Sequence, residues 1–157
     1  MITCQFEDKH GALLRHVTVD GIVAMDNKIL LVRRADGLLE GGKYALPGGY
    51  LDRDETTEEG VLREVLEETG YRGKIVELFA ISDKPDRGDD RQNVSFFYII
   101  EASEKTGEPD KESKEVAWFD LNALPDSSEV AFDHYEAIGL FKGYKKEQFK
   151  LPVIMGR

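Results

Sequence analysis

The sequence predicts an α/β sandwich, and three observations carry this prediction. Apolar residues alternate along several short segments, which is typical of strands. Two other segments repeat apolar residues at spacings of three and four, which is typical of helices, and strand-like segments lie before and between them. The chain of 157 residues is long enough for one core and short for two. We therefore expect a single domain over residues 1–157.

The first elements expected are a hairpin and a short edge strand. Apolar residues recur with a period near two over residues 16–25, and Asp26 and Asn27 suit the tight turn that follows. Residues 29–32 then resume an extended pattern. Residues 43–46 predict a further strand or loop edge, which the Pro47-Gly48-Gly49 segment is expected to end.

The clearest helix is expected from Thr56 to Thr69. Thr56 and Glu59 have the spacing of a capping box, and Gly70 follows the last periodic residue, where a left-handed conformation favours glycine. The apolar side chains that repeat every four residues are expected to face the sheet; they are Val61 and Val65, and Leu62 and Leu66.

Three strands and a second helix complete the expected fold. The strands are predicted at residues 75–81, 94–102 and 115–119. The helix is predicted over residues 133–142, with Asp133 and Glu136 at capping spacing. Its buried stripe is expected to comprise Tyr135, Ile138 and Phe141.

Composition excludes several classes of function. The 31 Asp and Glu residues outnumber the 21 Lys and Arg residues, so the net charge of −10 disfavours binding to nucleic acid or to anionic membranes. Cys4 is the single cysteine, which excludes an intramolecular disulfide and a multi-thiolate zinc site. The apolar runs are strand-sized and no secretory signal is evident, so we expect a soluble cytoplasmic protein.

Three glutamates of the first helix share one face. Glu64, Glu67 and Glu68 lie three and four positions apart, and like charges at this spacing cost a few tenths of a kcal/mol unless a cation neutralises them. Mg²⁺ suits such a stripe because it binds carboxylates while keeping positions for water and phosphate oxygens. Taken alone, the stripe is more typical of a solvated helix face than of a metal site.

The spacing around these glutamates favours the metal site. Gly49 is followed after five residues by Glu55, and after seven more by the segment Arg63-Glu64-Val65-Leu66-Glu67-Glu68-Thr69-Gly70-Tyr71. Residues 49–71 closely resemble the Nudix box, and a chance match at all seven identity positions has a probability of about 10⁻⁸ per starting position. Tyr71 stands where the family has an aliphatic residue.

This resemblance implies a Nudix fold, an α/β/α sandwich with a mixed sheet and a loop–helix–loop catalytic motif. It implies Mg²⁺, with Mn²⁺ as a substitute, held by Glu64, Glu67, Glu68 and the Gly49 carbonyl. Arg63 is expected to brace Glu55, and Gly70 to support the site by ending the helix. The general base is left open between Glu64 and Glu112, a carboxylate in the later loop where similar proteins carry one.

The resemblance also implies hydrolysis of the diphosphate linkage of a nucleoside diphosphate derivative. Pro85 stands fifteen residues after Gly70, which resembles ADP-ribose pyrophosphatases and favours ADP-ribose, and Arg87 and Arg91 are candidates for binding its phosphates. The alternatives are a nucleoside triphosphate pyrophosphatase and a nucleotide-sensing binding module. The resemblance is compatible with a homodimer.

Aromatic and histidine residues were the remaining candidates for substrate contacts. A base or adenosine needs an aromatic or apolar slot, and the candidates are Phe96, Tyr98, Trp118 and Phe132. The three histidines lack metal-ligand spacing and are expected at surface or capping positions; they are His10, His16 and His134.

Overall fold

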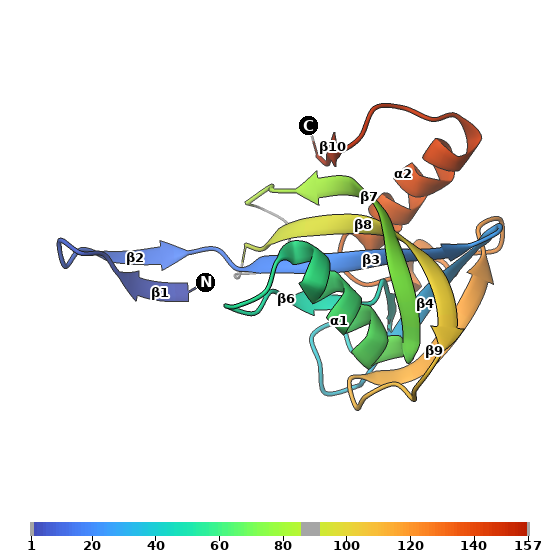
Figure 1. The fold of residues 1–157 in the computed structure, drawn as a ribbon, viewed down its shortest axis with the longest axis horizontal. Coiled ribbons are helices and arrows are strands. Elements are labelled where there is room, and N and C mark those ends of the chain that lie inside the picture. The colour runs from blue at the N-terminus through green and yellow to red at the C-terminus, as the bar shows by residue number, and fades with distance from the viewer. Residues whose placement is uncertain (1, 86–91, 157) are drawn as a thin grey trace.

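The computed structural model describes residues 2–85 and 92–156, in which a mixed eight-stranded sheet carries one helix on each face (Figure 1). The helices are α1 (Thr57–Thr69) and α2 (His134–Lys146), and a short 3-10 turn, η1 (Ser127–Glu129), precedes α2. The strands of the sheet are β3 (Val17–Met25), β4 (Lys28–Arg34), β5 (Tyr44–Ala45), β6 (Gly48–Tyr50), β7 (Tyr71–Ser82), β8 (Val94–Lys105), β9 (Ser113–Asp120) and β10 (Val153–Ile154). The predicted α/β/α sandwich is confirmed.

The sheet is mixed because it contains both parallel and antiparallel pairs of strands. Its order is β10-β7-β8-β3-β4-β5, with β6 paired to β3 and β9 paired to β4. The pair β3–β8 is parallel, as is β10–β7, whereas β7–β8 and β4–β9 are antiparallel. The long parallel pair β3–β8 lies inside the sheet, so β3 is in a position to carry buried side chains toward both helices.

The predicted β3–β4 hairpin is confirmed, with Asp26 at a left-handed φ of 54° in its turn. The strand predicted at residues 43–46 is present as β5 and ends before Pro47, but Gly48 and Gly49 then form a further strand, β6, against the first half of β3, which was not predicted. The backbones approach closely there: a Cβ on Gly48 would lie 2.3 Å from the carbonyl oxygen of Val19. Glycine is therefore required at this position for the pairing of β6 with β3.

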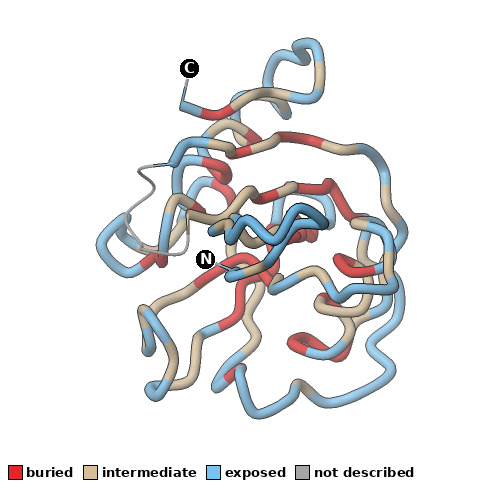
Figure 2. Tube along the Cα trace, turned by 90° about the vertical axis from the view of Figure 1, so that its left-hand side faces the viewer, coloured by how far each residue is buried: buried red, intermediate tan, exposed pale blue. Residues whose placement is uncertain are grey.

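Helix α1 has the ends that its sequence predicts. Thr56 and Glu59 form the capping box, and Gly70 adopts a left-handed φ of 74° directly after the last turn. Val61 and Val65 are buried in the cluster between α1 and the sheet. A second cluster lies between the opposite face and α2, so buried residues follow the inner strands and both helices (Figure 2).

Two expectations for α2 were wrong. Asp133 occupies the N-cap position but makes no capping hydrogen bond; its carboxylate instead accepts from the Ser82 hydroxyl at 3.0 Å. Tyr135 is 41% exposed and does not belong to the buried stripe. The buried positions are His134, Ala137, Ile138 and Phe141, whose spacing of i, i+3, i+4 and i+7 defines one face of a helix. His134 thus occupies the place that Tyr135 was expected to fill.

An N-terminal hairpin was not expected from the sequence. Strands β1 (Ile2–Gln5) and β2 (Gly11–Leu14) form a separate two-stranded sheet that projects from the body of the molecule (Figure 1). Its apolar side chains, including Ile2, Phe6 and Leu13, are exposed. Across the described part of the chain, neither helix has the length and hydropathy needed to cross a membrane.

Candidate active site

A cleft of about 350 Å³ lies between the polar face of α1, strand β6 and the start of α2. Helix α1 contributes Arg63, Glu64 and Glu67 to its wall, and β6 contributes Gly48 and Gly49. Four residues of the predicted site, Gly49, Arg63, Glu64 and Glu67, therefore line a cavity large enough for a small ligand, whereas Glu55, Glu68 and Gly70 are not among its lining residues.

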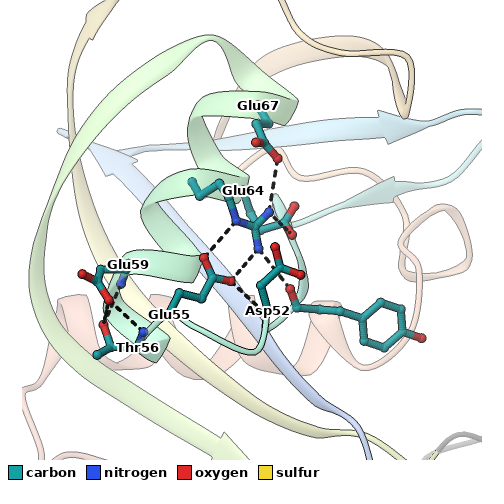
Figure 3. Close-up of polar contacts among 8 residues, drawn as sticks. Asp52, Glu55, Thr56, Glu59, Glu64 and Glu67 are labelled. Atoms are coloured by element: carbon teal, nitrogen blue, oxygen red, sulfur yellow. Dashed lines mark hydrogen bonds and ion pairs between the residues drawn. The ribbon is translucent and has the colours of Figure 1, made fainter. Parts of the chain in front are cut away.

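Arg63 contacts three carboxylates around α1, those of Glu55, Glu64 and Glu67, which are labelled in Figure 3. Its Nε and Nη2 donate to the two oxygens of Glu55 at 3.0 and 2.7 Å, and its Nη1 donates to Glu64 at 2.8 Å and to Glu67 at 3.2 Å. Hydrogen bonding by Arg63 is also the main cause that lowers the pKa of Glu55. A guanidinium does not give up its proton at neutral pH, so Arg63 braces the carboxylates and is no acid or base.

Glu68 and Glu64 are carboxylates in unfavourable surroundings. Glu68 is only 4% exposed, and burial raises its pKa to about 8, against the opposing effects of a hydrogen bond from Gly48 and the charge of Arg34. The Gly48 amide donates to Glu68 Oε2 at 3.0 Å. Burial also raises the pKa of Glu64, although Arg63 acts to lower it. Both groups would be stabilised as anions by a nearby cation.

Gly49 lies directly against Glu64. A Cβ added to Gly49 would be 2.5 Å from Glu64 Oε1, which is too close for two non-bonded atoms. The backbone of β6 is thus held against the helix carboxylates at the point where the Gly49 carbonyl was expected to help bind a metal. Any side chain at this position would displace Glu64.

The chemistry of these groups fits a divalent cation. Carboxylate and carbonyl oxygens are the ligands that Mg²⁺ prefers, and the raised pKa values of Glu64 and Glu68 show that both are destabilised as anions. Within residues 2–85 and 92–156, no three acidic, histidine or cysteine side chains form a ready-made set around an ion. An open arrangement suits Mg²⁺, which usually keeps several waters and also binds substrate phosphates.

Two acidic residues face α1 from the loop between β8 and β9. Glu112 lines the cleft, and its charge acts on Glu64 to raise the pKa of that residue. Asp110 also lines the cleft, and its amide donates to the Glu67 carbonyl at 2.9 Å, which ties the loop to α1. Sequence reasoning missed Asp110, although it stands only two positions from Glu112.

None of the three residues expected to determine substrate specificity is found in the described lining of the cleft. Pro85 is exposed and is not among the residues that line the cleft. Arg87 and Arg91 lie outside the described residues. Arg34, which was not predicted, does line the cleft, and its charge lowers the pKa of Glu68. The signal that could have found it is its place at the end of a predicted strand that leads toward the glycine segment.

Phe132 is the member of the aromatic candidates that lines the cleft. It is 42% exposed, has a left-handed φ of 56°, and carries the Arg34 guanidinium 5.0 Å from its ring centroid. A bulky residue in this conformation is uncommon and marks a strained position. The other three aromatics pack in or against the cluster beneath α1; they are Phe96, Tyr98 and Trp118.

The histidines differ in their surroundings. His10 is exposed beside Asp8, as expected, and His16 is partly buried next to Tyr50. The expectation of a surface or capping role was wrong for His134, which is 5% exposed and lines the cleft. Its Nε2 lies 3.3 Å from Asp20 Oδ1, and Asp20 also lines the cleft.

Comparison with known proteins identifies this arrangement. The profile of the NUDIX domain family matches residues 14–141. An ADP-ribose pyrophosphatase of Methanocaldococcus jannaschii is 39% identical over 129 residues, which cover 82% of this chain and 74% of that protein. A putative 8-oxo-dGTP diphosphatase of Mycobacterium tuberculosis is 33% identical over 119 residues, covering 74% of this chain and 53% of that protein.

The fold is also that of solved relatives. The crystal structure of a NUDIX hydrolase from Nitrosomonas europaea superimposes with a TM-score of 0.78 at 25% sequence identity. The alignment covers 98% of this chain and 92% of that one. The similarity therefore extends beyond the box helix to the sheet and both helices.

Proposed function

This chain belongs to the Nudix family of hydrolases, and we propose that it hydrolyses the diphosphate linkage of ADP-ribose with the help of Mg²⁺. One observation carries the proposal: the partly buried Glu64 lines an open cleft, and Glu64 and the buried Glu68 are both held against β6. The similarity to an ADP-ribose pyrophosphatase over most of both chains supports the choice of substrate. The family as a whole depends on divalent metals.

We propose that Glu64, Glu67, Glu68 and the Gly49 carbonyl hold the metal. When bound, Mg²⁺ or its substitute Mn²⁺ supplies charge neutralisation at phosphate oxygens and an activated water. Arg63 keeps Glu64 and Glu67 in position through its hydrogen bonds, and Glu55 fixes Arg63 in turn. The site thus requires the loop before α1 as well as the helix itself.

Glu112 is our candidate for the general base, with Glu64 as the alternative. A carboxylate that acts as general base must be able to reach a water molecule and accept its proton. Glu64 is engaged by Arg63 and packed against Gly49. Glu112 is exposed on the facing wall of the same cleft, where it is open to solvent.

Phe132 and Arg34, which also line the cleft, suit the organic part of the substrate. The exposed ring of Phe132 offers a surface for stacking, and Arg34 beside it carries a positive charge toward the diphosphate. Pro85, Arg87 and Arg91 stay predictions for the same substrate. A nucleotide of this size fills a cavity of several hundred Å³.

Product identification tests this function. The protein is incubated with ADP-ribose and Mg²⁺ in ¹⁸O-labelled water, and the products are identified by mass. We expect AMP and ribose 5-phosphate, with the label in one of the two phosphates. Glu58→Gln, on the exposed first turn of α1, serves as a control that should retain the wild-type rate.

A nucleoside triphosphate pyrophosphatase is the second candidate, favoured by the similarity to the putative 8-oxo-dGTP diphosphatase. It predicts a nucleoside monophosphate and pyrophosphate as products from a triphosphate panel. Faster turnover of any triphosphate than of ADP-ribose, compared by kcat/KM, would replace the first candidate with the second. A lack of turnover with every nucleotide would instead favour the binding module.

A further inference from the structure

His134 is buried in the cleft wall although the proposed chemistry does not use it. The ring packs edge-to-face against two aromatic residues, Phe97 at 6.1 Å and Phe132 at 5.3 Å between centroids. Its first nitrogen, Nδ1, accepts a hydrogen bond from the Leu46 amide at 3.0 Å. Because Nδ1 acts as an acceptor, the proton of the neutral ring resides on Nε2, which faces Asp20.

These contacts connect α2 with the segment that precedes β6. Leu46 is the residue before Pro47, and the Pro47 carbonyl accepts from the Gly21 amide at 2.8 Å. Asp20 is paired in register with Gly48, and a Cβ on Gly48 would lie 2.8 Å from Asp20 Oδ1. His134 therefore contacts Leu46, two residues before Gly48, and Asp20, the residue of β3 that pairs with Gly48.

Gly48 in turn contacts the proposed metal-binding carboxylates. Its amide donates to Glu68, and the next residue, Gly49, lies against Glu64. A buried carboxylate keeps its orientation only while its partner stays in place, and partners of metal ligands commonly affect metal affinity by tenfold or more. The position of the residue 46–49 segment is therefore of direct consequence for Glu64 and Glu68.

We propose that His134 is a positioning residue, whose acceptance of the Leu46 amide holds the 46–49 segment against Glu64 and Glu68 and thereby maintains divalent-cation affinity. The proposal rests on the metal site of the proposed function. It does not depend on which nucleotide is hydrolysed, so failure to cleave ADP-ribose would leave it testable.

The side chains of asparagine and glutamine separate the two contacts of His134. The carboxamide oxygen of Asn can occupy the place of Nδ1 and accept from Leu46, whereas the amide nitrogen of Gln reaches the place of Nε2 beside Asp20. The variants His134→Asn, His134→Gln and His134→Ala are titrated with Mn²⁺ alone, and free Mn²⁺ is measured by electron paramagnetic resonance. Tyr135→Ala, an exposed neighbour on α2, is the matched control.

We expect His134→Ala and His134→Gln to bind Mn²⁺ about tenfold more weakly than the wild type. His134→Asn and Tyr135→Ala should stay within about threefold of the wild type, because the first keeps the acceptor and the second leaves His134 unchanged. Affinity is expressed per folded molecule, with folding checked by circular dichroism. If His134→Ala does not fold, the comparison of Asn with Gln decides.

Two results would overturn the proposal. Wild-type Mn²⁺ affinity in the folded Ala or Gln variant would show that the 46–49 segment needs no support from His134. Equal loss of affinity in the Asn and Gln variants would show that the Leu46 contact is not the cause. A merely structural role predicts lower thermal stability with unchanged Mn²⁺ affinity, and that result also contradicts the proposal.

Discussion

Glu68 has the least favourable surroundings of the proposed metal ligands, since its carboxylate is almost fully buried and its pKa is raised to about 8. A group of this kind costs stability whenever it is charged without a cation. Glu68 therefore lowers the stability of the protein when it is charged and no cation is bound, and ionisable groups in such surroundings are typical of functional positions. Replacing it with a neutral amide of the same shape separates the functional need for its charge from its structural role.

We predict that Glu68→Gln lowers kcat with ADP-ribose and Mg²⁺ by at least about 10²-fold, because one ligand charge is lost. Without metal, the variant should be as stable as the wild type or more so, since the amide oxygen can still accept from Gly48. Steady-state kinetics and thermal melting in EDTA measure the two effects. Near-normal turnover, with Glu58→Gln as the reference, would remove Glu68 from the metal site.

Glu112 gives a prediction of a different kind, because it is expected to act on water and not on the metal. Glu112→Gln should lower kcat by roughly 10²-fold while the Mg²⁺ concentration for half-maximal activity changes less than about threefold. A Mg²⁺ titration of the rate measures both quantities. An unchanged kcat would assign the general base to Glu64, and a large shift in the Mg²⁺ requirement would make Glu112 a metal ligand.

At the scale of elements, glycines within the two helices have opposite roles. A Cβ on Gly60 of α1 would lie 2.9 Å from both Glu55 Oε1 and Leu51 Cδ1, whereas a Cβ on Gly139 of α2 would contact nothing within 4 Å. The Glu55 oxygen cannot withdraw freely, because it accepts from Arg63 and from the Asp52 amide. The helix that carries the site is thus constrained by the loop before it.

We predict that Gly139→Ala raises the free energy of unfolding by up to about 1 kcal/mol, which is the usual helix-propensity gain. Gly60→Ala should lower it by about 1 kcal/mol or more, because the steric conflict with Glu55 exceeds the same gain. Urea denaturation measures both changes. Stabilisation by Gly60→Ala would show that Glu55 is free to move and does not fix Arg63.

The sequence predicted elements well where local signals decide them. The capping box and Gly70 defined α1 to within one residue, and the alternation of apolar residues located β3, β4, β7 and β8. It failed where distant residues decide, as for β6, whose two glycines become a strand only by pairing with β3. The burial of His134 had the same cause, because its partners stand far away in the sequence.

The site was predictable to a similar extent. Fixed spacing along one helix placed Arg63 and the three glutamates together, and the structure brings Glu112 to the facing wall. Arg34 and Asp20 come from β4 and β3, and no spacing rule connects them with α1. Tyr71 stands where the box has an aliphatic residue, and its partner is also distant in the sequence. Its hydroxyl accepts a hydrogen bond from the Trp118 indole at 3.3 Å.

At the scale of the whole molecule, the lining of the cleft is rich in acidic residues, as is the chain as a whole, which has a net charge of −10. The described lining includes seven carboxylates and two guanidiniums, those of Arg34 and Arg63. The carboxylates are Asp20, Asp52, Glu64, Glu67, Asp110, Glu112 and Asp133. Such a surface repels a diphosphate unless divalent cations offset it.

We therefore predict that ADP-ribose binding requires a divalent cation. Calorimetry with Glu112→Gln, chosen to slow turnover, should show affinity for ADP-ribose at least about tenfold weaker in EDTA than in Mg²⁺, since the lining repels the diphosphate. Na⁺ at matched ionic strength serves as the control for screening. Equal affinity in EDTA and Mg²⁺ would show that Arg34 and the uncharged wall suffice for binding.

The raised pKa values give the folded protein a characteristic dependence of stability on pH. The pKa of Glu68 is about 8 in the folded protein and near 4.5 when unfolded, so between these values the folded state retains a proton that the unfolded state has lost. Stability without metal should therefore fall as pH rises from about 4.5 to about 8. Glu64, whose pKa is also raised, acts in the same direction.

A divalent cation reverses this trend because it competes with the proton for the same carboxylates. We predict that saturating Mg²⁺ raises the melting temperature more at pH 8.5 than at pH 5.5, as measured by thermal melting with and without EDTA. In Glu68→Gln, the metal-free fall in stability across this range should become shallower, leaving the part due to Glu64. A slope unchanged by this substitution, or a Mg²⁺ effect equal at both pH values, would show that the buried carboxylates do not bind the cation.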